Sequence, residues 1–232
     1  MERRIRILHI TFDMGFGGTE QVIRQLINHL DPDRFECEIA CIDGEPGEIG
    51  QQLARDKGIV IHARQRTPGF DTALVRWLHG IIKTGRFDVV HGHQYSPFLY
   101  GWLAHWLTGA RVVFTEHGRF HPDRHRKKAR FINPFIARTS QALVAISGAT
   151  RDALGEYEYM PVSNIQVIYN GIEPLSLDSG RTTQIKAELN ISPDEIVIGT
   201  VARLDPVKNQ ALLLTATRRL RDEGYPLSPS RK

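Results

Sequence analysis

Short apolar runs alternate with amphipathic helical stretches over most of this chain. Runs rich in β-branched and apolar residues predict strands at 5–12, 36–42, 59–63, 88–91, 111–116, 142–146 and 165–169. Apolar residues at helical spacing predict helices between them, at 22–30, 48–57, 72–84, 97–107, 124–139 and 147–156. Parallel strands need such crossover helices, so the alternation predicts an α/β fold: a doubly wound, Rossmann-like parallel sheet with helices on both faces.

The alternation is interrupted after Asn170-Gly171. We expect an N-terminal domain over residues 1–172, a polar linker over 173–183 and the start of a second α/β unit over 184–232. The second unit shows a short helix at 184–189, a strand at 196–201 and a helix at 210–220 before a tail of turn-forming residues. One strand with its helices cannot bury all of their apolar faces without neighbouring strands, so we expect this unit to be incomplete.

Polar residues follow several of the expected strands at their carboxyl ends, where doubly wound sheets bind their ligands. The candidate ligand-binding residues there are Gly17, Gly18 and Glu20 after the first strand, His91 and His93 at the end of the fourth, and His117 after the fifth. Histidines at one edge of a sheet suit either internal hydrogen bonding or contact with a substrate, and both interpretations stay open. Their spacing matches no metal-ligand pattern, so we expect no metal site.

The loop that contains Gly17 and Gly18 favours a ligand-binding turn, although a tight turn that needs glycine for geometry alone explains it equally well. Glycine lets a ligand approach the backbone, and the following helix offers N–H groups to an anion. A dinucleotide fingerprint needs a third glycine where Glu20 stands, so hydride transfer is disfavoured. Arg203 and Lys208 form a second candidate phosphate site beside an expected helix start, with a solvated loop as the alternative.

Six short motifs occur in order along the chain. They are Gly17-Gly18-Thr19-Glu20, Asp88-Val89-Val90-His91-Gly92-His93, Thr115-Glu116-His117-Gly118, Val144-Ala145-Ile146-Ser147, Val167-Ile168-Tyr169-Asn170-Gly171-Ile172, and Gly199-Thr200-Val201-Ala202-Arg203-Leu204 with Lys208-Asn209. Together they resemble the family 4 retaining glycosyltransferases, which have the GT-B fold. The resemblance covers the N-terminal, acceptor-side domain, the linker and the first piece of the nucleotide-binding domain.

The resemblance implies a hexosyltransferase that takes a sugar from a nucleotide sugar, such as a UDP- or GDP-sugar, with retention of configuration. Gly17 and Gly18 would approach the donor diphosphate, which Arg203 and Lys208 would neutralise as it leaves. His117 would be the catalytic residue, hydrogen bonded to donor hydroxyls beside the oxocarbenium-like state. The family needs no divalent metal, so no cofactor is expected.

The same resemblance implies an acceptor side formed by Glu20, His93 and Arg119. The acceptor itself is unknown; a glycan, a lipid-linked sugar or an envelope polysaccharide under construction all fit. The family's base-gripping loop and paired glutamates do not follow Leu220, so we expect a truncated chain that is weakly active or inactive alone. Two alternatives stay open: a non-catalytic fragment that binds an acceptor, a membrane or a partner, and an enzyme resembling nucleotide-sugar epimerases.

Charge and cysteine content bear on location and partners. The segment from Arg119 to Arg130 is strongly basic, which suits either a solvated helix face or peripheral contact with anionic lipid at the inner face of a membrane. No nucleic-acid motif is present, and no apolar run reaches the length of a membrane span. Cys37 and Cys41 lie on one expected strand, too far apart to pair, which favours a reducing cytoplasm.

Overall fold

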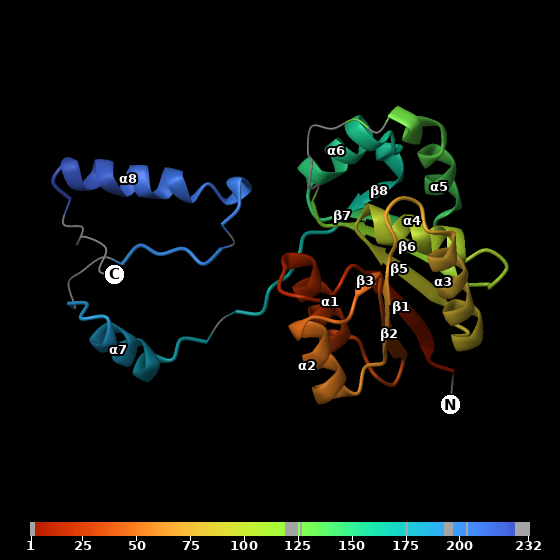
Figure 1. The fold of residues 1–232 in the computed structure, drawn as a ribbon, viewed down its shortest axis with the longest axis horizontal. Coiled ribbons are helices and arrows are strands. Elements are labelled where there is room, and N and C mark those ends of the chain that lie inside the picture. The colour runs from red at the N-terminus through yellow and green to blue at the C-terminus, as the bar shows by residue number, and fades with distance from the viewer. Residues whose placement is uncertain are drawn as a thin grey trace. The chain divides into compact units, whose positions relative to one another are not determined.

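The chain forms two compact units, Met1–Ile172 and Glu173–Lys232. The computed structural model describes residues 3–118, 125, 127–174, 176–192, 197–202 and 204–225, and Figure 1 shows both units as ribbons. Each unit is described by itself below. No helix among these residues combines the length and the apolar character needed to cross a bilayer.

The first unit contains an eight-stranded sheet in the order β3-β4-β2-β1-β5-β6-β7-β8. Every neighbouring pair is parallel except β3 and β4. The strands are β1 (Ile5–Thr11), β2 (Phe35–Cys41), β3 (Asp43–Gly44), β4 (Ile61–Gln65), β5 (Val89–His93), β6 (Arg111–Glu116), β7 (Ala142–Ala145) and β8 (Ile165–Val167). The predicted doubly wound sheet is confirmed, and its strand order reverses between β1 and β5, the place where such sheets bind ligands.

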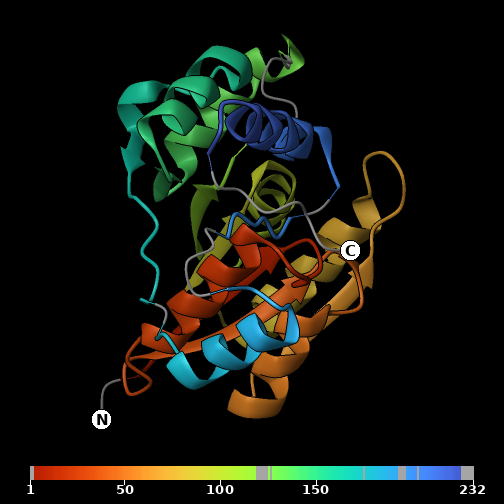
Figure 2. The same ribbon diagram turned by 90° about the vertical axis from the view of Figure 1, so that its left-hand side faces the viewer.

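Helices cover both faces of this sheet. On one face, α1 (Gly18–His29) and α2 (Glu48–Lys57) pack in the smaller core. On the other face, the larger core contains residues of α3 (Thr72–Gly85), α4 (Tyr95–Ala104), α5 (Asn133–Thr139) and α6 (Gly148–Glu158). Figure 2 looks from the side of α1 and α2. Leu8 and Ile10 of β1 point into the larger core with α3 and α4, so the residues between them point the other way.

Helix α4 lies very close to β5 because the contact positions are glycine. A Cβ at Gly92 would lie 2.4 Å from the Cα of Phe98, and one at Gly101 would lie 2.9 Å from Cδ1 of Ile10. Phe98 in turn stacks on Phe114 with ring centroids 4.2 Å apart. These contacts hold the start of α4 directly against the carboxyl end of β5.

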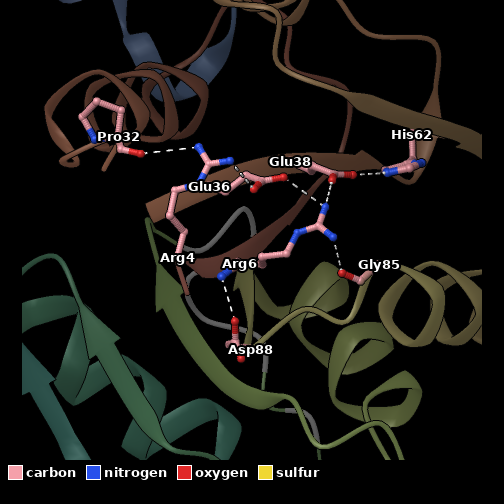
Figure 3. A network of polar contacts seen from close by, with 8 residues as sticks. All are labelled: Arg4, Arg6, Pro32, Glu36, Glu38, His62, Gly85 and Asp88. Carbon is pink, nitrogen blue, oxygen red and sulfur yellow. Dashed lines mark hydrogen bonds and ion pairs between the residues drawn. The ribbon is translucent and has the colours of Figure 1, made fainter. Parts of the chain in front are cut away.

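Ion pairs join the amino ends of β1 and β2 to the turn before β5 (Figure 3). Arg6 Nη2 lies 2.5 Å from Glu38 Oε1, and Arg6 Nη1 donates to the Gly85 carbonyl at 2.5 Å. The Arg6 backbone N–H donates to Asp88 Oδ2 at 2.8 Å, and Glu38 Oε2 also meets His62 Nε2 at 2.7 Å. This network lies at the opposite ends of the strands from the polar rim, so it stabilises the sheet and takes no part in a rim site.

One expected helix of the first unit is divided in the structure. The helix predicted at 124–139 is divided in its described part into a 3-10 helix, η1 (Lys127–Phe131), and α5, because Pro134 has no N–H to continue a helix and instead occupies the first turn of α5. Helix α3 ends at Gly85, one residue beyond the range predicted from its apolar spacing, and Arg86 adopts the left-handed cap conformation. A Cβ at Gly85 would meet the Phe87 ring at 2.3 Å.

The described part of the second unit contains helices and extended loops. They are α7 (Ser179–Glu188), a 3-10 helix η3 (Pro206–Lys208) and α8 (Gln210–Asp222). Helix α7 begins inside the expected linker, because the Asp178 side chain caps it by accepting from the Arg181 N–H. The strand predicted at 196–201 is wrong over its described residues: 197–202 form no strand, and Val201 is fully exposed, since no neighbouring strand pairs with this segment.

Candidate active site

Four histidines gather at the carboxyl ends of β1, β5 and β6, and we call them the histidine cluster: His9, His91, His93 and His117. The register pairs His9 with His91 across β1 and β5 and pairs His93 with Thr115 across β5 and β6. Paired residues of parallel strands point to the same face, so these side chains all lie on the α1 side of the sheet. His9 is 1% exposed and His93 is fully buried.

Hydrogen bonds join three of these rings in a row, which we call the histidine chain: His9, His93 and His117. His9 Nδ1 lies 3.0 Å from His93 Nε2, and His93 Nδ1 lies 3.0 Å from His117 Nε2. His91 stands outside the chain, since its Nε2 meets Thr115 Oγ1 at 2.8 Å, although its ring centroid is only 4.1 Å from that of His93.

Burial keeps the whole cluster uncharged near neutral pH. Removal from water lowers the pKa of His9 and of His117 to about 4. Burial, reinforced by the neighbouring histidines, lowers the pKa of His91 and His93 well below the usual value. The rim therefore presents neutral imidazoles, which can donate and accept hydrogen bonds without adding positive charge.

His9 was not recognised as a site residue from the sequence, where it reads only as a polar break in an apolar strand. It joins the site through strand pairing with residues more than 80 positions away. One ring nitrogen each of His9, His91 and His93 lies within 4.8 Å of the others, a spacing that could admit a cation. Sequence spacing did not indicate this approach, and the expectation of no metal site stays a prediction.

The two loop glycines before α1 do different things. Gly17 is the N-cap residue of α1, and a Cβ there would lie 2.2 Å from Oε2 of Glu20, so the missing side chain leaves room for the carboxylate over the loop. Gly18 is exposed, and a Cβ there would meet nothing within 4 Å. The backbone at Gly18 is therefore open to a ligand at the start of a helix.

Gln94 connects this loop to the end of β5, a link that the sequence analysis missed. Its Nε2 donates to Thr19 Oγ1 at 3.3 Å, and its backbone N–H donates to the Thr115 carbonyl at 2.9 Å. Its backbone has φ 68° and ψ 162°, a strained conformation for a residue with a side chain. Strain held in place by surrounding bonds is common at binding sites, and here it lies between the glycine loop and the histidine cluster.

The predicted site residues fall into three groups. Five of them lie at the carboxyl rim of the first unit: Gly17, Gly18, Glu20, His93 and His117. Lys208 is exposed and ends η3 in the second unit. Arg203 and Arg119 lie outside the described residues. Both ring nitrogens of His93 lie 3.0 Å from a nitrogen of another histidine in the described part of the structure. Its place on the acceptor side stays a prediction.

Comparison with known proteins gives one consistent result. The model of Glycosyltransferase Family 4 matches residues 16–174. EpsF of Bacillus subtilis (strain 168), whose name describes it as a candidate glycosyltransferase, is 26% identical over 229 residues, which are 94% of this chain and 59% of EpsF. The UDP-Gal:alpha-D-GlcNAc-diphosphoundecaprenol alpha-1,3-galactosyltransferase of Escherichia coli is 22% identical over 93% of this chain and 58% of its own length.

A solved structure agrees with the sequence comparisons. HepE of Anabaena, crystallised in complex with UDP and glucose, superposes with a TM-score of 0.75 at 18% identity, over 93% of this chain and 58% of HepE. This chain therefore spans a little under three fifths of the length of each of these proteins. The family match over the rim-bearing unit, together with the parallel sheet and its glycine loop, shows that the chain belongs to Glycosyltransferase Family 4 and contains the Rossmann-like N-terminal domain of a GT-B fold.

Proposed function

We propose that this chain belongs to a retaining glycosyltransferase that transfers a sugar from a nucleotide-sugar donor to a glycan, lipid-linked or envelope acceptor. The observation that supports it most directly is the meeting of an open glycine backbone and a neutral histidine cluster at the point where the strand order reverses. The printed names of the E. coli relative and of the HepE complex, which include UDP-Gal, UDP and glucose, favour a UDP-sugar as the donor.

The donor diphosphate would bind at the start of α1. The first helical N–H groups have no side-chain cap, and Gly18 leaves their approach unobstructed. Lys208, together with Arg203, would supply the positive charge that stabilises the departing diphosphate. Electrostatic stabilisation of a leaving group in this way needs no metal ion.

The neutral state of His117 suits a place beside the transferred sugar. A retaining transfer passes through a state in which positive charge develops on the sugar ring, and an imidazolium beside it would oppose that charge. With its pKa lowered to about 4, His117 remains neutral and can hydrogen bond a donor hydroxyl without this penalty. We propose His117 as the catalytic residue for this reason.

The acceptor would approach from the side of Glu20 and Arg119. A lipid-linked acceptor would bring the protein to a membrane surface, and the first unit has a face that suits one. Phe131, Ile132 and Phe135 are 77%, 52% and 53% exposed, beside the exposed cation Arg130. Apolar side chains flanked by cations are the usual composition of a surface that docks on anionic lipid.

Calorimetric titration of the chain with UDP-sugars tests the donor site. Gly18→Ala should weaken donor binding at least tenfold while leaving the melting temperature unchanged, because its Cβ meets no protein atom but occupies the path to the helix N–H groups. Gly80→Ala is the matched control: it also adds a Cβ in open space, but on α3 away from the rim. Equal donor affinity in the Gly18→Ala variant and the wild type would contradict the assignment.

Two further measurements separate the alternatives. If the chain binds vesicles that contain anionic lipid and does not bind nucleotide sugars, it is instead a non-catalytic fragment that docks on membranes. The exposed side chains of Phe131 and Phe135 favour this alternative. Isomerised nucleotide sugar formed without any acceptor would indicate an epimerase. In a version that transfers sugar, His117→Ala should lower turnover by orders of magnitude with the fold intact.

A further inference from the structure

The hydrogen bonds of the histidine chain restrict where the ring protons of His9, His93 and His117 can lie. Both of its internal bonds join two ring nitrogens at 3.0 Å. Each such bond contains one proton, so one nitrogen must be the donor and the other the acceptor. A neutral imidazole has one N–H and one lone pair, and all three rings are buried strongly enough to be neutral.

These two facts leave only two arrangements of protons. If His117 donates from Nε2, then His93 accepts at Nδ1, must donate from Nε2, and forces His9 to accept at Nδ1 and hold its own proton on Nε2. If His9 donates from Nδ1, the same reasoning runs back along the chain and places a proton on Nδ1 of every ring. All three histidines therefore share one tautomer in either arrangement.

We propose that His9 and His93 are positioning residues that tie the neutral tautomer of His117 to their own and hold its ring in one orientation. The proposal rests on the proposed function only in taking His117 as the group that meets the donor sugar. His9 makes no contact with that sugar; it acts through His93.

The two ends of the chain show why the far histidine matters. Nδ1 of His117 and Nε2 of His9 are both buried, and neither has a hydrogen-bond partner among the described residues. No further protein group in that part of the structure decides between the two arrangements. A hydroxyl that donates to His117 would select protons on Nε2 throughout the chain, and one that accepts would select Nδ1 throughout.

Nitrogen-15 spectra of the histidine-labelled chain at about pH 7.5 test the proposal, since they distinguish protonated from unprotonated ring nitrogens. In the wild type, His9, His93 and His117 should show the same ratio of the two tautomers, because each chain bond ties one ring to the next. In His9→Phe, His93 loses its partner at Nε2, so the ratio at His93 and His117 should change, because leaving that buried nitrogen without a partner costs a different free energy when it is protonated than when it is not. His9→Asn, whose amide can donate or accept, should move the ratio back toward that of the wild type.

His91→Phe is the matched control, because His91 is buried in the same cluster but bonds Thr115 and leaves both chain bonds in place. It should leave the shared tautomer unchanged. Tautomer ratios that differ among the three rings of the wild type would overturn the proposal without any variant, and so would unchanged His117 shifts in His9→Phe. Stoichiometric zinc binding that removes the shared protons would overturn it as well. Because none of these readouts involves sugar transfer, loss of donor binding with the shared tautomer intact would refute the proposed function and leave this inference standing.

Discussion

Acid should unfold the first unit by charging its buried histidines. The folded-state pKa of His9 is lowered to about 4, against about 6.5 in the unfolded chain. The unfolded state therefore binds a proton that the folded state excludes, and stability falls as the pH drops from the unfolded value toward the folded one. His117 has the same shift, and the pKa values of His91 and His93 are lowered in the same direction.

The magnitude follows from how far the pH lies below the unfolded pKa. At about pH 5 the distance is about 1.5 units, and each unit corresponds to about 1.4 kcal/mol. His9 alone should thus lower the free energy of unfolding by about 2 kcal/mol between about pH 7.5 and pH 5, and His117 by a similar amount. Asp71, whose pKa is lowered to about 2, adds nothing in this window because its contribution is lost only below the ordinary aspartate pKa.

Urea unfolding followed by tryptophan fluorescence measures the free energy of unfolding of the first unit, because that unit contains all three tryptophans, Trp77, Trp102 and Trp106. His9→Phe should reduce the pH dependence by about 2 kcal/mol.

Two results would refute the reasoning. The first is an unfolding free energy of the wild type that is the same, within about 0.5 kcal/mol, at the two pH values, because the buried rings would then be taking up protons without cost. The second is a His9→Phe variant with the full pH dependence of the wild type. Either would mean that the histidine cluster is not held neutral by burial.

Three further substitutions should change stability by amounts that the same urea assay can measure. Gly92→Ala should cost about 3 kcal/mol or prevent folding, because its Cβ would lie 2.4 Å from the Phe98 backbone; a cost under about 1 kcal/mol would show that α4 can move away. Ser147→Ala should cost about 1 kcal/mol by removing the cap to the Thr150 N–H, and no loss would mean that the cap is replaced by water. Arg6→Met should cost about 2 kcal/mol through its lost ion pairs yet leave the histidine tautomer unchanged; a changed tautomer would show that the two ends of the sheet are coupled.

Local signals predicted individual elements well where a capping residue was present. The helix at 48–57 has the bounds that were predicted, because Gly58 directly after it takes the left-handed conformation that ends a helix. Ser147, the first residue of the helix predicted at 147–156, caps α6 by accepting from the Thr150 N–H. The division before α5 also has a local signal, because Pro134 cannot continue a helix that begins before it. The apolar spacing on both sides of Pro134 favoured one continuous helix at 124–139 instead.

Strand predictions succeeded only where a partner strand existed. The segment at 196–201 has the same β-branched character as β1, yet its described residues form no strand and expose Val197 and Val201. A strand is stabilised by its neighbours, so its sequence is necessary but not sufficient. The same dependence on neighbours governs the site.

The sequence by itself determined the fold class, the order of the elements of the first unit, and the placement of Gly18 and His117 at the carboxyl rim, because alternating periodicity and turn residues are local properties of the chain. The tertiary structure alone decided that Gly17 makes room for Glu20, that Gln94 joins two loops, and that His9 belongs to the site. The register of parallel strands brings His9 to His93 across 84 residues of chain, and no local pattern specifies which strands will pair.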